Sequence, residues 1–496
     1  MPEPITETDD IQGLLKSGYG PLTESTQLLL RVRDGSKARA WLAGHPPTSM
    51  ADLARRVPSA VHVALSAPGL RALGVSETTI AAFSPEFAAG MAADPARSRR
   101  LGDVGQNAPE RWAWGTAAWE PHLLLMLFAE PGGLAAVRAG IATPRFKAAF
   151  EVRELAAASL DGNEPFGFAD GVSQPQIDWA GARRPNTPAD LDYGNRIAAG
   201  EFVLGYVNEY GLITQRPLLA PGEDPAGILP RDAEAAGRPD LGRNGSYLVL
   251  RQLDQDVRGF WRFARAHGGQ PLAEAMVGRR LDGQPLVATS GKAIRGVGPK
   301  PDDLRLNGFD FDSDPQGLAC PFAGHIRRAN PRTGDMPGGD RGLVATLLGQ
   351  LGFGIDRRAD TIASSRFHRL LRRGRKYGRT LTPAQAADPA TPDPKAGLLF
   401  VGLCASLARQ FEFVQGAWLA SAKFGGLTGE QDPLLGSRAP FPGDQRTDSF
   451  RQPQAAGPCR EIEALPQFIR VRGGGYFFLP GLRALKFIAV GGPTHD

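Results

Sequence analysis

Histidines are the first residues to consider for chemistry, because a histidine side chain can bind a metal or carry a proton near neutral pH. The chain of 496 residues contains only seven of them. His325 lies in the stretch CPFAGHIRRANPR (320–332), where three arginines follow it within seven residues. A histidine-bound metal beside an anionic ligand would explain this grouping, and so would a solvated basic loop. The local sequence leaves both interpretations open.

A single carboxylate is the second candidate. Asp170 lies in FGFADGVSQPQ (166–176), close to Gly167 and Gly171, and no other charged residue is within five positions of it. Gly and Asp are typical of turns. An aspartate kept apart from other charges can also accept and release a proton. The two interpretations are compatible, because glycines allow a backbone to approach a ligand closely.

A basic segment surrounds His368. The stretch SSRFHRLLRRGRKYG (364–378) contains six Lys and Arg residues. Its apolar residues have helical spacing, which predicts a basic helix that ends at Gly374. Basic clusters of this kind can bind nucleic acid or a membrane, so a basic-surface binding module is one alternative function. No chemistry is assigned to His368.

Bulk properties exclude several classes of protein. Hydrophobic residues make up 42% and charged residues 22% of the chain, close to the averages of soluble globular proteins. The net charge of +5 is small and the basic residues are dispersed, so we expect no nucleic-acid partner. Three cysteines are too few for a disulfide framework. The apolar runs at 122–128 and 397–408 are too short to span a bilayer. With the polar start MPEPITETDDIQG, which does not read as a signal peptide, these features predict a cytoplasmic protein without a membrane partner.

An internal repeat indicates how the elements that carry these residues are organised. Three strand-like segments recur, two of them followed by a helix-like start, and long stretches rich in Gly and Pro suggest loop insertions. The matched pairs are 28–41 with 248–261, 61–74 with 476–486, and 122–131 with 397–406. Strands and helices in this mixture predict two α+β halves, each a sheet with helices on one face. Common nucleotide-binding, zinc-protease and serine-hydrolase motifs are absent from the sequence.

Four segments, taken together and in order, resemble those of the dye-decolourising haem peroxidases. They are the GxxDG motif at 167–171, the histidine segment at 320–332, LLRRGRKYG at 370–378 and GLLFVGLCASLARQFEFVQGAW at 397–418. DIQG (10–13) and LGDVGQNAPERW (101–112) also look like family segments. The long loops and the N-terminus resemble the longer, intracellular bacterial branch.

The resemblance implies the fold and the cofactor. The family fold is a pair of ferredoxin-like α+β halves of the dimeric α+β barrel type, with haem b (iron protoporphyrin IX) in the C-terminal half. We therefore expect an N-terminal half over 1–208 that includes GxxDG, a linker or loop over 209–244, and a haem-binding half over 245–496.

The resemblance also implies the roles of the central residues. His325 stands in the position of the proximal iron ligand, and Asp170 in that of the general base for hydrogen peroxide. Arg372, with Arg373 as the alternative if the register is off by one, would stabilise the charge that develops in heterolytic O–O cleavage. Because an aspartate stays ionised in more acidic solution than a histidine, turnover should persist at low pH.

Further residues are expected around the haem. Glu412 would accept a hydrogen bond from the second nitrogen of His325, although a surface glutamate is an equal alternative. Leu398 and Phe400, two apart on a strand, should share one face and pack over the haem.

The two remaining expectations concern the His325 loop and the electron donors. Arg327 and Asn330 would meet the haem propionates or shape the His325 loop. Bulky dyes would be oxidised by electron transfer through a surface Tyr or Trp, with Tyr377 and Trp418 among seven of each. The oligomeric state is not predicted.

The resulting hypothesis is a haem peroxidase that reduces hydrogen peroxide and oxidises dyes, phenols or similar aromatic donors. The alternative is a haem-binding or iron-handling protein of the same fold without turnover. The joint presence of Asp170, Arg372 and His325 favours the enzyme, because a carrier needs only the ligand.

Overall fold

The computed structural model describes residues 4–185, 187, 193–232, 234–235, 237–289, 294, 296–297, 301–334, 364–438 and 447–490. The strands are β1 Glu24–Val32, β2 Ser59–Leu65, β3 Leu123–Ala129, β4 Phe150–Ala156, β5 Gln176–Asp178, β6 Arg196–Ala198, β7 Ser246–Gln255, β8 Leu371–Arg372, β9 Arg375–Tyr377, β10 Ala396–Cys404, β11 Phe450–Gln452, β12 Arg460–Ile462 and β13 Ile469–Leu479. The α-helices are α1 Gly35–Gly44, α2 Ala67–Ala72, α3 Glu77–Ala81, α4 Pro85–Ala89, α5 Pro95–Leu101, α6 Leu134–Ile141, α7 Pro144–Ala149, α8 Val257–His267, α9 Gln270–Val277, α10 Pro301–Asn307, α11 His325–Ala329, α13 Pro383–Ala387 and α14 Leu482–Val490.

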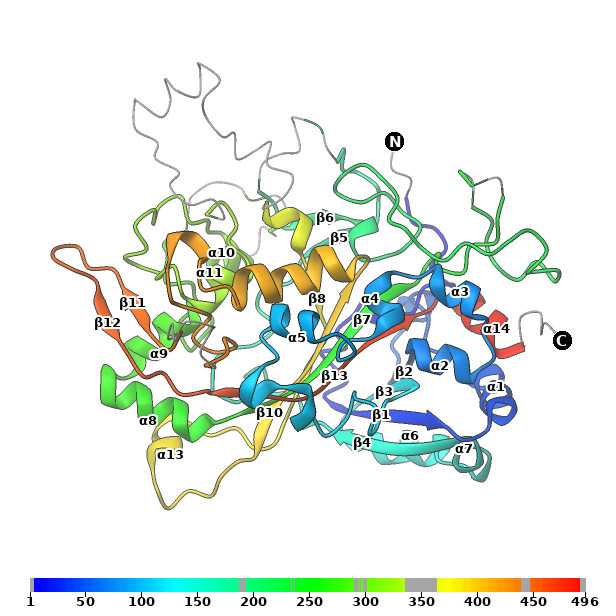
Figure 1. The fold of residues 1–496 in the computed structure, drawn as a ribbon, viewed down its shortest axis with the longest axis horizontal. Coiled ribbons are helices and arrows are strands. Elements are labelled where there is room, and N and C mark those ends of the chain that lie inside the picture. Colours follow the sequence, from blue (N-terminus) through cyan, green and yellow to red (C-terminus); the bar gives the residue numbers. More distant parts are fainter. Residues whose placement is uncertain are drawn as a thin grey trace.

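Nine strands form the main sheet, in the order β4-β1-β3-β2-β13-β7-β10-β8, with β9 also pairing with β10. The first four come from the N-terminal part of the chain and the others from the C-terminal part. When β8 and β9, which both pair with β10, are counted as one strand, each group has its strands in the order fourth, first, third, second. The two groups meet where β2 pairs antiparallel with β13, at Leu65 and Phe478. In Figure 1 the sheet crosses the molecule, with α8 and α9 at one end and α1, α2 and α14 at the other.

The strand order agrees with two of the three sequence matches. The 28–41 and 248–261 segments form β1–α1 and β7–α8, the first strand and helix of each group, and 122–131 and 397–406 contain the third strands, β3 and β10. The match between 61–74 and 476–486 does not join equivalent strands, since β2 is second and β13 fourth. Pro68 lies in the first turn of α2, so the shared PGLRAL is a local strand-to-helix signal.

The two faces of the sheet have different coverings. Leu28, Leu125 and Val249 belong to one hydrophobic cluster, together with residues of α1, α8 and α14. Leu29 and Leu124, which point the opposite way, belong to a second cluster with the N-terminal segment and the loop around 197–206. β3 is buried along its whole length, as expected of an uninterrupted apolar run in a central strand.

The predicted basic helix over 364–374 is wrong. The chain forms one 3₁₀ turn at Ser365–His368, then the short strands β8 and β9. Gly374 lies so close to β10 that an added Cβ would be 2.7 Å from the carbonyl oxygen of Leu399. Strand pairing with β10 therefore overrides the helical spacing of the apolar residues.

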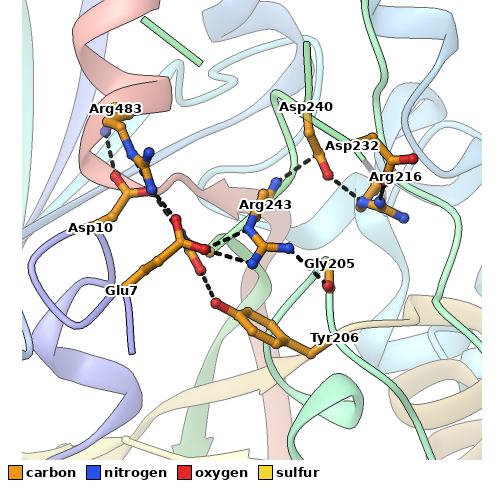
Figure 2. A network of polar contacts seen from close by, with 10 residues as sticks. Glu7, Asp10, Gly205, Tyr206, Arg216, Asp232, Asp240, Arg243 and Arg483 are labelled. Carbon is orange, nitrogen blue, oxygen red and sulfur yellow. Dashed lines mark hydrogen bonds and ion pairs between the residues drawn. The ribbon is translucent and has the colours of Figure 1, made fainter. Parts of the chain in front are cut away.

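The loop over 209–244 is tied to both ends of the chain by polar contacts (Figure 2). Arg243 donates to Glu7 at 2.8 and 2.6 Å, and Arg483 of α14 pairs with Asp10 at 3.1 Å. Within the loop, Arg216 lies between Asp232 and Asp240, with 2.5 Å from its Nε to Asp240. These side chains of Arg216, Asp232 and Asp240 are almost completely buried. Leaving either carboxylate unpaired would be strongly destabilising, since breaking a buried ion pair costs about 3–5 kcal/mol.

Gln12, in the DIQG segment, joins the two groups of strands. Its amide nitrogen donates to the carbonyl oxygens of Val63 (2.8 Å) and Pro480 (3.0 Å), and its amide oxygen accepts from the Val63 N–H. The same oxygen accepts from Nδ1 of His62 at 3.2 Å, which leaves Nε2 to accept from the Tyr19 hydroxyl at 2.9 Å. The family-like DIQG segment is therefore a structural feature of the seam between the groups.

His62 should make folding sensitive to acid. Burial lowers its pKa from 6.5 to about 3, so the unfolded chain takes up a proton below pH 6.5 while the folded chain does not. The free energy of unfolding should therefore fall as the pH drops from 6.5 towards 3, by about 3 kcal/mol between pH 7 and pH 4 from this group alone. Urea unfolding of the protein and of His62→Gln at both pH values measures the difference.

The half-buried His267 offers a control for this test, because His267→Gln removes a histidine without touching the seam. A His62→Gln variant that loses as much stability in acid as the unchanged protein would contradict the assignment.

None of the helices in the described ranges is long and apolar enough to cross a membrane. All three cysteines are free, with Cys320 and Cys404 buried and Cys459 exposed.

Candidate active site

A cavity of about 300 Å³ lies against the C-terminal strands, on the face of the sheet that the helices cover. Its apolar wall is formed by Leu253, Leu398, Phe400, Ile469 and Val471 from β7, β10 and β13. Leu398 and Phe400 share one face of β10 as predicted. The segment over 407–419 supplies further lining residues from two π-helical turns, a helix type that often occurs at functional sites.

His325 begins α11 and lines this cavity. Its Nδ1 lies 2.9 Å from Oδ2 of Asp432, a fully buried carboxylate. The other oxygen of Asp432 accepts the N–H groups of Leu434 (2.9 Å) and Leu435 (2.7 Å). Burial alone would raise the pKa of Asp432, but His325 and these amides lower it overall. A carboxylate only accepts hydrogen bonds, so Nδ1 carries the proton and Nε2 is left for a ligand.

Glu412 was the predicted partner of His325, and this prediction is wrong. Its carboxylate contacts Nε of Arg97 at 2.9 Å and accepts from the Tyr476 hydroxyl at 2.9 Å. The π-helical turns direct Glu412 towards α5 and β13 instead of α11. The sequence signal for Asp432 was weak: an Asp-Pro pair, typical of a turn whose aspartate accepts from the following amides.

Asp170 lies in a tight turn and also lines the cavity. Its Oδ1 accepts from the N–H of Gly171 at 2.6 Å. Gly167 and Gly171 have φ of 100° and 71°, in the region that glycine adopts readily. The turn therefore leaves the carboxylate of Asp170 exposed at the cavity. This agrees with the expectation that a turn and a proton-carrying aspartate are compatible in this segment.

Glu164, which sequence reasoning missed, holds this turn in place. It accepts the N–H groups of Phe166 and Phe168 at 3.0 Å each, and the side-chain amide of Gln255 on β7 at 2.9 Å. Burial is the main cause that raises the pKa of Glu164 to about 7, and the charge of Asp170 adds to it. The glutamate therefore anchors the Asp170 turn to the sheet while lining the cavity.

Arg372, the last residue of β8, and its neighbour Arg373 point in different directions. Arg372 lines the cavity, and its guanidinium donates to the carbonyl oxygen of Ser173 at 2.6 Å. Desolvation lowers the pKa of Arg372, while the charge of Asp170 acts in the opposite sense. Arg373 instead donates to the carbonyl oxygens of Leu14 (2.8 Å) and Leu15 (3.2 Å). The geometry favours Arg372 over Arg373 for the cavity, and its chemical role stays a prediction.

Three more arginines line the cavity: Arg279, Arg332 and Arg369. None forms an ion pair with a carboxylate in the part of the chain that the structure describes, and they donate instead to carbonyl, amide or hydroxyl oxygens. Burial lowers the pKa of Arg279 to about 9, and the charges of Arg332 and Arg372 contribute. This wall can therefore neutralise the carboxylates of an anionic ligand.

The chain is similar in sequence to known proteins over most of its length. No family model matches the chain. It is 29% identical over 508 residues to the multifunctional dye peroxidase DyP2 of Amycolatopsis sp., covering 93% of this chain and 91% of that protein. It is 27% identical over 458 residues to the dye-decolorizing peroxidase msp1 of Mycetinis scorodonius, covering 87% and 76%. Over most of its length the chain is thus similar to peroxidases of the dye-decolourising type.

Solved structures show the same fold over nearly the whole length of the chain. A DyP-type peroxidase from the fungus Auricularia auricula-judae superposes with a TM-score of 0.70 at 23% identity, covering 98% of this chain and 99% of that one. An ancestral D-type dye-decolorizing peroxidase matches equally well, with the same TM-score and coverage. The α+β architecture of the family thus extends across the described ranges.

Arg327 and Asn330, predicted beside the cofactor of this peroxidase, have different positions. Arg327 is buried away from the cavity, where it donates to Asp314 (2.9 Å) and to the carbonyl oxygen of Cys320 (2.7 Å). A propionate contact for Arg327 is therefore wrong, and it shapes the loop before His325. Asn330 lines the cavity, and its Oδ1 is buried without a hydrogen-bond partner among the described residues.

Other family-like segments of the peroxidase also reach the cavity. In 101–112, Asp103 and Asn107 are lining residues, and Asp103 pairs with Arg251 of β7. Trp418 is buried in a small hydrophobic cluster, which excludes it as an exposed site of electron transfer. Tyr377 is partly buried and donates its hydroxyl hydrogen to Asp254.

Proposed function

We propose that this protein is a haem peroxidase that reduces hydrogen peroxide and oxidises dyes, phenols or similar aromatic donors. One observation carries the proposal. A histidine oriented by a buried carboxylate, an aspartate in a tight turn and an arginine all line a single largely apolar cavity, from segments far apart in the sequence.

The residues of the cavity fit haem b. His325 has a free Nε2 for the iron, and hydrogen bonding of Nδ1 to Asp432 fixes the ring and raises its basicity. Leu398 and Phe400 offer an apolar surface for a macrocycle. The cavity-lining arginines that pair with no carboxylate among the described residues would provide positive groups for the propionate end.

The remaining groups suit proton transfer to peroxide. Bound haem would supply the redox chemistry that divides the O–O bond. Asp170 would take a proton from one oxygen of hydrogen peroxide and return it to the other, so that the second oxygen leaves as water. The guanidinium of Arg372 would stabilise the negative charge that develops on the leaving oxygen. Glu164 would hold the Asp170 turn at the distance this transfer needs.

The finer features of fold and location are part of the same proposal. The repeated order fourth, first, third, second supports two ferredoxin-like halves of the α+β barrel type, over 1–208 and 245–496, joined by 209–244. His325, Arg372 and Phe400 belong to the second half, which supports haem binding there. The low cysteine content and the long loops support a cytoplasmic location and the longer bacterial branch of the family as parts of this proposal.

The choice of donors follows from the relatives. One is named a multifunctional dye peroxidase, and one matching structure is a dye-decolorizing peroxidase in complex with 2,6-dimethoxyphenol. We therefore propose both dyes and phenols as electron donors of this protein.

Turnover of the haem-loaded protein tests the function. With hydrogen peroxide it should oxidise both an anthraquinone dye and 2,6-dimethoxyphenol in mildly acidic solution, far faster than free haem at the same concentration. Stable haem binding with no oxidation above the free-haem control would instead indicate a haem carrier.

A further inference from the structure

A pocket of about 470 Å³ lies at the surface beside the cavity wall. Its lining residues are Gln106, Arg111, Arg470, Val471 and Arg472. Val471 lines the cavity as well, so one residue is common to the two hollows. The volume is within the range usual for small-molecule sites, about 300–1,000 Å³.

The backbone of β13 places charge on the outer side of this wall. Ile469 and Val471 are buried and line the cavity, whereas Arg470 between them is exposed. The pairing of β13 with β7 shifts register between Val471 and Gly473, and Arg472 lies at this irregularity. Such bulges redirect side chains, and here both arginines line the outer pocket.

A second segment completes the pocket and is fixed against the strand. The N–H of Val471 donates to Oδ1 of Asn107 at 3.1 Å, and the N–H of Ala113 donates to the carbonyl oxygen of Arg472 at 2.7 Å. These bonds flank Arg111 in sequence and fix its backbone beside β13, where Arg111 lines the same pocket as Arg470.

The rim carries an excess of positive charge. Arg472 pairs with Asp254 at 3.2 Å. Arg111 and Arg470 form no ion pair with a carboxylate in the described ranges. Two uncompensated guanidinium groups attract an anion, and their flat faces stack on aromatic rings.

We propose that this pocket binds anionic aromatic electron donors, such as aromatic sulfonates or carboxylates, just outside the cavity wall. The proposal rests on the proposed peroxidase function and names a substrate class and its docking site. Two donor molecules would each lose one electron, and these electrons with two protons reduce one hydrogen peroxide to two waters.

Equilibrium binding tests the site without turnover. Calorimetric titration of the haem-loaded protein with naphthalene-1,5-disulfonate at low salt should show binding that weakens about threefold in Arg111→Gln or Arg470→Gln and about tenfold in the double variant. Arg145→Gln, which removes one exposed charge from α7 in the N-terminal group, should leave the affinity unchanged. No binding by the unchanged protein, or equal weakening by Arg145→Gln, would overturn the proposal.

Donor selectivity provides the second readout. In the double variant, the ratio of kcat/KM for a disulfonated anthraquinone dye to kcat/KM for neutral 2,6-dimethoxyphenol should fall about tenfold. An unchanged ratio would overturn the docking site even if both donors are oxidised. Failure to oxidise either donor would reject the peroxidase function, while the binding titration still decides whether the pocket takes aromatic anions.

Discussion

Replacing His325 by alanine should abolish stable haem binding. His325 lines the cavity, and its ring is held in a fixed orientation by a buried carboxylate, with 2.9 Å between Nδ1 and Oδ2 of Asp432. Haem titration followed by gel filtration should show a Soret band that co-elutes with the unchanged protein and not with His325→Ala. His267→Ala, at the end of α8 and outside the cavity lining, is the matched control.

A substitution of Asp432 should weaken haem binding without abolishing it. Asp432→Asn keeps the side-chain shape but removes the negative charge that orients His325, so haem affinity should fall about 10–100-fold without being lost. Haem retention by His325→Ala equal to that of the control would contradict the assignment of the ligand. An unchanged affinity in Asp432→Asn would restrict Asp432 to holding the Leu434–Leu435 turn.

The second large effect concerns the reaction with peroxide. Arg372→Leu should keep its haem but react with hydrogen peroxide about 100–1,000-fold more slowly, because a positioned charge on the leaving oxygen typically contributes this much. Stopped-flow absorbance of the haem-loaded variant measures the rate directly.

Arg373→Leu is a sharp control, because the neighbouring arginine contacts Leu14 and Leu15 and does not line the cavity. It should lose some stability and react at the normal rate. If Arg373→Leu were slow and Arg372→Leu normal, the roles of the two arginines would be reversed.

Asp170→Asn separates the proton transfer from the charge stabilisation. The variant should bind haem normally, since the one hydrogen bond that the Asp170 carboxylate forms among the described residues is with the N–H of Gly171, but its turnover in acidic solution should be lost. Persistent turnover across the acidic range would show that Arg372 suffices without a carboxylate base.

Local sequence signals predicted the elements that are defined by nearby residues. The glycines around Asp170 indicated a turn, and the two-residue spacing of Leu398 and Phe400 indicated a shared strand face; both agree with the structure. The order of segments in the resemblance indicated that His325 and Arg372 would meet, although 47 positions separate them. Only the fold shows that they line one cavity.

The failures have a common physical cause, because they depend on tertiary contacts. Asp432 reaches His325 across 107 positions, and nothing near His325 signals this partner. Glu412 was a plausible hydrogen-bond partner of His325, but the π-helical turns place its carboxylate against Arg97 and Tyr476. Pairing with β10 turned a helical pattern around Gly374 into two short strands.

The most direct test is the absorption spectrum of the haem-loaded protein before and after one equivalent of hydrogen peroxide. We expect a Soret band on loading with one haem per chain, and a rapid change of that band when peroxide is added. A Soret band that peroxide leaves unaltered, or no Soret band at all, would contradict the account of His325, Asp170 and Arg372 as one peroxide-activating site.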